Sequence, residues 1–94
     1  MNMEHLVSNN TSQQQFEVHE NGETAVLQYR FFEGAVWLMH TEVPASLEGK
    51  GIAATLAHYS LEWARENHKK VKVVCPFVAT YLKRHPEYND LVIN

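Results

Sequence analysis

Two glycines one residue apart, Gly49 and Gly51, form the stretch of this sequence best suited to hold a ligand. Because glycine has no Cβ, the backbone there can turn tightly and approach a bound group closely. A helix beginning at Ile52 would direct its free N–H groups and the positive end of its dipole at the same place. The usual occupant of such a place is a phosphate or pyrophosphate. Residues 52–55 contain no Asp or Glu, so negative charge there would come from outside the chain.

Other interpretations of the glycines are weaker. Gly49-Lys50-Gly51-Ile52-Ala53-Ala54 matches the dinucleotide fingerprint G-x-G-x-x-G/A. That fingerprint needs a strand directly before it and an acidic residue about twenty positions later. Here residues 44–48 intervene, and no acidic residue lies near Val73. A Walker loop is excluded because no Gly-Lys-Ser/Thr follows the required spacer. A plain turn into a helix stays open as an alternative.

Two other side chains at the ends of expected strands could take part in chemistry. Cys75 ends the β-rich residues 71–75 and directly precedes an expected helix, whose N-terminus would lower the thiol pKa. A nucleophile or acyl relay and a small buried thiol both stay open for it. Glu42 is a candidate general base, with an ordinary solvated carboxylate as the alternative. The six histidines lack paired metal-ligand spacing, so no metal site is expected.

Size and composition limit the possible functions. The 94 residues allow one small core. A balance of 8 basic and 11 acidic residues, formally −3, argues against a dedicated nucleic-acid binder. No apolar run is long enough to span a membrane, and residues 1–5 do not resemble a signal peptide. The single cysteine suits a reducing compartment, so we expect a cytoplasmic protein without a nucleic-acid or membrane partner.

The first half of the chain has the pattern of β-strands. Three segments are expected to form strands: residues 16–20, 24–31 and 35–43. Asn21-Gly22 is a strong hairpin signal and Glu33-Gly34 marks a second turn, so the strands form an antiparallel meander. Residues 8–15 are entirely polar, and residues 1–15 are therefore expected to be a disordered tail before a single domain, 16–94.

The second half changes to helical periodicity. Apolar residues recur at spacings of four, three and four from Ile52 to Trp63. A strand–helix–strand connection then makes residues 71–75 parallel to residues 35–43. Pro76 begins a second helix that stops at Pro86. The predicted fold is an α/β (α+β) mixed sheet in the order β-β-β-α-β-α. Its expected core residues are Val26, Leu27, Val36, Leu38, Ile52, Leu56, Trp63, Val73 and Leu82.

Four motifs, in this order, resemble those of a known family. They are His40-Thr41-Glu42-Val43-Pro44, Glu48-Gly49-Lys50-Gly51-Ile52-Ala53, Val74-Cys75-Pro76-Phe77-Val78 and Tyr81-Leu82-Lys83-Arg84-His85-Pro86-Glu87-Tyr88. Together they resemble the small GNAT-like N-acetyltransferases, a minimal branch of the GNAT superfamily, over residues 16–92. The resemblance implies a GNAT-like fold and an enzyme that transfers an acetyl group from acetyl-coenzyme A to an unidentified amine by direct attack on the thioester.

The resemblance also implies which residues hold the cofactor. In the superfamily, Gln/Arg-x-x-Gly-x-Gly/Ala wraps the pyrophosphate with backbone amides, and Gly51 and Ala53 are its small residues here. Glu48 stands where the family has Arg or Gln, which places a carboxylate near an anionic ligand. The backbone of the strand end would bind the pantetheine arm, with the Val43 amide polarising the thioester carbonyl. The implied cofactor-binding residues are Thr41, Val43, Gly49, Lys50, Gly51, Ile52, Ala53 and Ala54.

For catalysis, the resemblance points to Tyr81 as the acid that protonates the departing thiolate, with helix packing as its alternative. The family also has a cysteine at the position of Cys75. Ordinary GNAT proteins carry helices between their first two strands, whereas this sequence has only Asn21-Gly22 there. The acceptor side is therefore expected to be open, which favours an amine on a macromolecule. Asn21-Gly22 and Glu48 also favour a second hypothesis, a non-catalytic acyl-CoA-binding or protein-interaction module.

Overall fold

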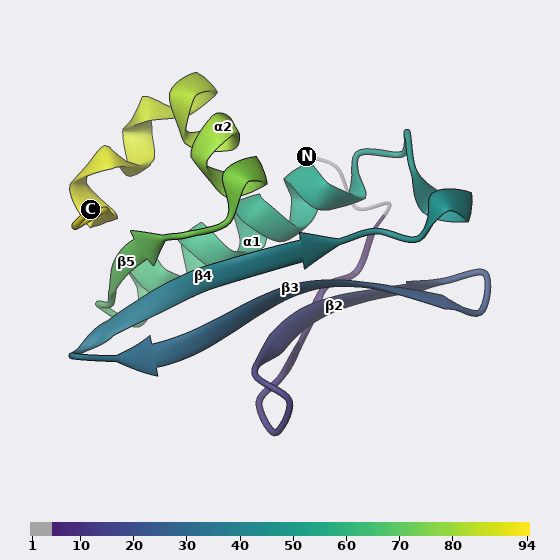
Figure 1. Cartoon of the computed structure of the whole chain (residues 1–94), viewed down its shortest axis with the longest axis horizontal. Coiled ribbons are helices and arrows are strands. Elements are labelled where there is room, and N and C mark those ends of the chain that lie inside the picture. The colour runs from purple at the N-terminus through teal and green to yellow at the C-terminus, as the bar shows by residue number, and fades with distance from the viewer. Residues whose placement is uncertain (1–4) are drawn as a thin grey trace.

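A computed structural model describes residues 5–94 as a five-stranded sheet with two α-helices and two 3₁₀ turns (Figure 1). The elements are β1 (Ser8–Asn10), β2 (Gln15–Glu20), β3 (Glu23–Phe32), β4 (Ala35–Glu42), η1 (Ala45–Leu47), α1 (Ile52–Glu66), β5 (Lys70–Val73), α2 (Pro76–Arg84) and η2 (Pro86–Leu91). The strands lie in the order β1-β2-β3-β4-β5, antiparallel except for the parallel pair β4–β5. The predicted mixed α/β class and the parallel crossover are confirmed.

The core lies between α1 and one face of the sheet. Alternate residues of β2 and β3 point to the same face, so Phe16, Leu27 and Tyr29 are buried beneath α1. Of the expected core residues, Leu27, Val36, Leu38, Ile52, Leu56 and Val73 are buried. Val26, Trp63 and Leu82 are only half-buried. Val26 lies one residue from Leu27 and so points to the opposite face, and Trp63 packs against the rings of Phe16 and Tyr29 from α1.

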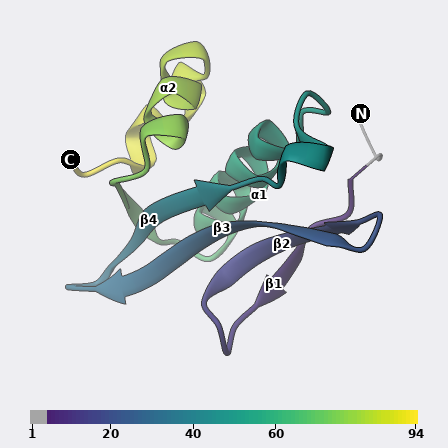
Figure 2. The same cartoon turned by 45° about the vertical axis from the view of Figure 1, so that its right-hand side comes forward.

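Strand β1 corrects the prediction of a disordered tail. Residues 8–10 pair with β2, from Ser8 opposite Glu17 to Asn10 opposite Gln15 (Figure 2). Asn9 accepts a hydrogen bond from the Tyr29 hydroxyl at 2.7 Å, and Asn10 donates to the Glu17 carboxylate at 2.9 Å. Polar side chains rather than an apolar pattern attach this strand, which is why its composition suggested disorder. Residues 1–4 lie outside the described residues.

Strand β4 has a bulge at the point where its partner β5 ends. Gln28 pairs with His40 while Tyr29 pairs with Leu38, which leaves Met39 as the extra residue. The pairing with β5 also ends at Leu38, whose carbonyl accepts the backbone N–H groups of Val74 and Cys75, both at 2.9 Å. The chain then leaves the sheet for α2, and β4 runs on to Glu42 paired with β3 but with no described strand on its β5 side (Figure 1). The divergence creates an opening between the end of β4 and the start of α2.

Candidate functional site

The glycine loop, residues 48–51, turns the chain into the start of α1. Gly49 and Gly51 have φ of +82° and +79°, in the left-handed region that side chains disfavour. A Cβ built on either would meet no described atom within 4 Å. Glycine is therefore required by the backbone conformation, and the space in front of the loop is open.

The backbone N–H groups from Gly49 to Ala54, called here the open amides, have no acceptor within residues 5–94. The first N–H to be satisfied is that of Thr55, which donates to the Gly51 carbonyl at 3.0 Å. Gly51 is the N-cap and offers no side-chain oxygen, and the first turn contains no acidic residue. The start of α1 therefore presents unsatisfied donors and the positive end of the helix dipole, with no acidic residue in its first turn.

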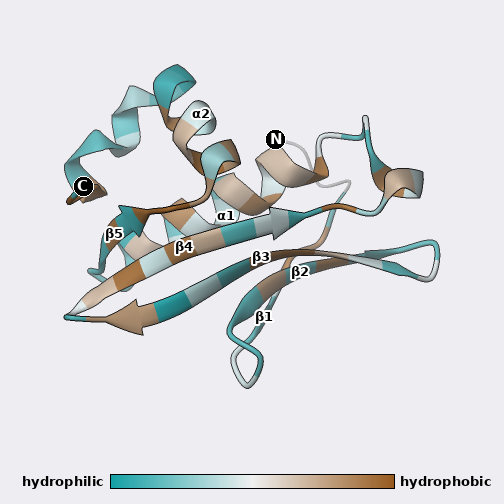
Figure 3. Ribbon diagram, viewed as in Figure 1, coloured by the Kyte–Doolittle hydropathy of each residue, from teal (hydrophilic) through white to brown (hydrophobic). Residues whose placement is uncertain are grey.

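The residues of the open amides, Lys50 excepted, line a cavity of about 250 Å³, called here the β4–α2 cavity. Its lining residues are Val43, Leu47, Glu48, Gly49, Gly51, Ile52, Ala53, Ala54 and Phe77. Val43 follows β4 and Phe77 lies in the first turn of α2, so the cavity is in the opening that the divergence of β4 and β5 creates. Figure 3 shows hydrophobic residues in both connections, after β4 and between β5 and α2. The cavity thus combines apolar walls with an edge of backbone donors.

Thr41 directs its backbone toward the same opening. Tyr29 donates its N–H to Gln14 on the β2 side. Its neighbour Gln28 must then direct its groups toward β4 and its partner His40, because successive residues of a strand alternate. By the same alternation, Thr41 directs its N–H and C=O away from β3, where β5 has already ended. This edge is suited to hydrogen-bond an extended ligand.

Cys75 is buried in the core beside the opening and is not among the residues lining the β4–α2 cavity. It is the N-cap of α2, is 2% exposed, and its Sγ lies 3.1 Å from the Thr41 hydroxyl. The structure therefore brings together Thr41 of β4 and Cys75 at the start of α2, which are 34 positions apart. Burial of the sulfur favours the packing interpretation that the sequence left open.

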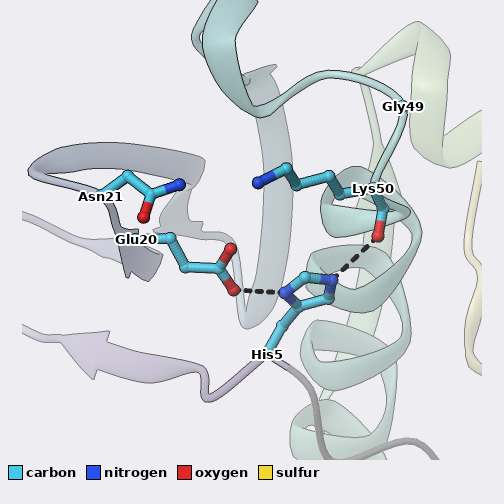
Figure 4. A pocket seen from close by; sticks show the side chains of 5 residues that line it. All are labelled: His5, Glu20, Asn21, Gly49 and Lys50. Carbon is cyan, nitrogen blue, oxygen red and sulfur yellow. Dashed lines mark hydrogen bonds and ion pairs between the residues drawn. The ribbon is translucent and has the colours of Figure 1, made fainter.

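Lys50 is separated from the other expected cofactor residues. It lines a second, more open cavity of about 700 Å³, the His5 cavity, with His5, Glu20, Asn21 and Gly49 (Figure 4). His5 Nδ1 pairs with the Glu20 carboxylate, and His5 Nε2 lies 2.8 Å from the Lys50 carbonyl oxygen. Sequence reasoning missed His5 because its partners are 15 and 45 positions away and no local pattern marks them.

Glu42 and Tyr81 are not among the residues lining the β4–α2 cavity. The Glu42 side chain is 73% exposed, and its carboxylate lies 3.8 Å from His40 Nε2. The Tyr81 ring stacks on that of His85, with 4.0 Å between ring centroids. Burial raises the pKa of Tyr81, and the nearby Glu87 and Glu62 raise it further. The phenol therefore keeps its proton at neutral pH, as a proton donor must.

Residues 15–91 match the model of a family described as GCN5-related N-acetyltransferase. The chain belongs to this family. Protein NATD1 of Homo sapiens is 36% identical over 83 residues, covering 85% of this chain and 74% of the relative. Protein NATD1 of Danio rerio is 30% identical over 93 residues, covering 94% and 84%. The solution structure of a GCN5-like protein from Staphylococcus aureus matches with a TM-score of 0.72 and 27% identity, covering 95% of this chain and 88% of that one.

Membership of the GCN5-related N-acetyltransferase family confirms the resemblance that the four motifs carried. The structural relative supports the same fold over nearly the whole chain. The first two strands, β1 and β2, are joined by residues 11–14, and Asn21-Gly22 instead joins β2 to β3. Neither connection in the described chain contains a helix that could wall an acceptor site. No helix within residues 5–94 is long and apolar enough to cross a membrane.

Proposed function

We propose that this family member binds acetyl-CoA in the β4–α2 cavity and transfers its acetyl group to an amine by direct attack. The observation that carries the proposal is the set of open amides at the edge of that cavity. An acyl-CoA carries a pyrophosphate, which such donors favour, and an extended pantetheine arm, which a free strand edge can hydrogen-bond.

The residues present fit that ligand on two counts. The open amides and the α1 dipole stabilise negative charge by about 0.3–1 kcal/mol in exposed geometry and up to about 2 kcal/mol when partly buried. Val43 and Phe77 provide apolar walls on the path toward Thr41. Glu48 lines the same cavity, and its negative charge repels an anionic ligand. It should therefore weaken the affinity for acetyl-CoA.

When bound, acetyl-CoA supplies an acetyl group activated as a thioester. In the proposed reaction the Val43 N–H polarises the thioester carbonyl, and Tyr81 donates its phenolic proton to the leaving sulfur. Cys75 packs beside the reacting group without carrying it. A lysine acceptor must first lose a proton, at a cost of about 5 kcal/mol at pH 7. Correct positioning contributes roughly 7–11 kcal/mol, which exceeds that cost.

Glu42 is proposed as the base that receives the proton of the amine. Its side chain is exposed at the end of β4, which supports access by an acceptor from solvent. An acceptor amine carried on a macromolecule could reach an exposed carboxylate there without entering a closed pocket. The short connections before β3 therefore support a macromolecular acceptor over a small one.

The test is acetyl transfer from acetyl-CoA to a panel of amines and proteins by three variants. Tyr81→Phe should lower kcat roughly a hundredfold, since general acids contribute about that much. Cys75→Ala should retain transfer, and Tyr59→Phe, at a half-exposed tyrosine of α1, is the matched control. Loss of transfer in Cys75→Ala with activity kept in Tyr81→Phe would replace direct attack with an acyl-cysteine route.

A second candidate is a non-catalytic acyl-CoA-binding module. It is favoured by Glu48 in the cavity and by the absence of Glu42 from the residues that line it. The same experiment separates the two functions, because a module would bind acetyl-CoA and transfer nothing to any acceptor.

A further inference from the structure

We propose that His5 is a positioning residue for the pyrophosphate site and that it acts in its protonated form. The inference rests on the proposed function, because it concerns the same open amides. It assigns a role to His5, which is not among the described residues lining the β4–α2 cavity.

His5 connects strand β2 to the glycine loop and does not line that cavity. Its ring lies between the Glu20 carboxylate and the Lys50 carbonyl (Figure 4). The His5 side chain is 6% exposed and that of Glu20 is 24% exposed. A buried ring with a partner on each nitrogen is held in one orientation and can in turn hold the loop.

The two ring partners of His5 within residues 5–94, the Glu20 carboxylate and the Lys50 carbonyl, are hydrogen-bond acceptors. An ionised carboxylate and a backbone carbonyl have no proton to give, so each ring nitrogen must donate one. A neutral imidazole carries only one N–H, whereas the imidazolium carries two. Among the described residues, the charged groups that line this cavity with His5 are Glu20 from β2 and Lys50 from the glycine loop. The arrangement is complete only when His5 is positively charged.

The contact of His5 with the Lys50 carbonyl also fixes the orientation of the Gly51 N–H, which belongs to the same peptide group. No cis peptide bond occurs in the described chain, so the Lys50 C=O and the Gly51 N–H point in opposite directions across their shared peptide. Holding the carbonyl toward His5 therefore directs the Gly51 N–H away from it. Gly51 lines the β4–α2 cavity and is absent from the lining of the His5 cavity. The charged donor on the carbonyl also polarises this peptide and strengthens its N–H as a donor.

A pH dependence follows, because histidines change charge between about pH 5 and 8. When His5 loses its second proton, the ring can no longer donate to both Glu20 and the Lys50 carbonyl, and the Lys50–Gly51 peptide is less firmly held. The sign is fixed: acetyl-CoA affinity is highest when His5 is protonated and falls as the pH rises through its titration.

The first measurement is the dissociation constant of acetyl-CoA from pH 5.5 to 8.5. The wild-type chain should weaken about tenfold over this range, the equivalent of one hydrogen bond. His5→Gln, which donates one bond and does not titrate, should bind with intermediate affinity and a flatter profile. His5→Ala should bind weakly throughout. In a transfer assay His5→Ala should raise KM and leave kcat unchanged. His19→Gln, at an exposed β2 histidine, should match the wild type.

A second measurement uses no ligand and separates this inference from the proposed function. The ¹⁵N–¹H resonance of Gly51 should titrate with the His5 ring in the wild type and stay constant in His5→Gln. If acetyl-CoA fails to bind while Gly51 titrates, the proposed function is wrong and the link from His5 to the loop stands. If Gly51 does not follow His5, or His5→Ala keeps wild-type affinity and pH profile, the inference is overturned.

Discussion

The two ends of helix α1 differ in how their backbone groups are satisfied. At the C-terminal end, Asn67 donates twice to the Trp63 carbonyl, and the Lys69 N–H donates to Ala64 at 2.8 Å. Arg65 in the last turn makes a two-point contact with Asp90, both bonds at 3.0 Å. At the N-terminal end, the amides from Gly49 to Ala54 have no described acceptor. One helix thus ends in internal hydrogen bonds and begins without them.

This difference indicates that the C-terminal end of α1 contributes to stability and that its N-terminal end is suited to binding. Internal hydrogen bonds and a cation near the C-terminus stabilise a helix. N-terminal donors without a cap contribute no such stabilisation to the free protein. The N-terminal end is instead held from outside the helix, through the bond from His5 to the Lys50 carbonyl. The N-terminal end of α1 is therefore held in place while its N–H donors stay without an acceptor, which suits it to bind an anionic ligand.

The largest effect is expected from placing a negative charge at the open end. Ala54→Glu adds a carboxylate in the first turn of α1, where it should stabilise the free protein by about 0.3–1 kcal/mol. The same carboxylate should repel a bound pyrophosphate, and acetyl-CoA affinity should fall at least tenfold. Calorimetric titration and thermal unfolding measure the two quantities.

Ala54→Gln is the matched control, because it has the same size without the charge. It should lose much less affinity than the Glu variant. Equal losses in both would mean that the side chain blocks the cavity sterically and would break the electrostatic account of this end.

A smaller effect, on stability alone, is expected at the other end. Tyr88 of η2 is buried, and its hydroxyl contacts Glu62 at 2.5 Å and His58 at 3.1 Å, both on α1. Tyr88→Phe removes these bonds at a cost of about 1 kcal/mol, so the melting temperature should fall by about 4–8 °C. Acetyl-CoA affinity should not change. A parallel loss of affinity would show that the two ends are coupled.

The smallest effect concerns acid stability. The hydrogen bond from Arg65 lowers the pKa of Asp90, so this pair stabilises the fold at pH above the usual aspartate pKa of about 4 and loses that contribution below it. Asp90→Asn should therefore show a smaller fall in melting temperature between pH 7 and pH 3 than the wild type. Arg65→Gln should reduce the same fall, because the guanidinium causes the shift. A wild-type slope in either variant would contradict the role of the pair.

Local patterns predicted the elements that position the site. The Asn21-Gly22 hairpin, the apolar face of α1 and the parallel β5 all follow from residue types at short spacing, and all are present. The glycines were recognised because their conformational freedom is a property of the residue itself. Family motifs then supplied Val43, which the structure places at the β4–α2 cavity.

Contacts between distant residues were not predictable in the same way. β1 is attached through Asn9 and Tyr29, whose hydrogen bond depends on the folded register. Lys50 lies between Gly49 and Gly51 in sequence yet lines the His5 cavity and not the β4–α2 cavity, since neighbouring residues of a tight turn need not point the same way. The contacts of His5 were not predictable because they form only when the fold brings β2 and the glycine loop side by side.

The most direct test of the central claim is a ¹⁵N–¹H amide titration that compares acetyl-CoA with acetyl-pantetheine, which lacks the pyrophosphate. The account predicts that acetyl-CoA shifts the resonances of residues 49–54 strongly and those of residues 63–69 little. Acetyl-pantetheine should shift residues 41–43 and leave 49–54 nearly unchanged. Equal shifts of residues 49–54 with both ligands, or none with acetyl-CoA, would contradict the assignment of the open amides to the pyrophosphate.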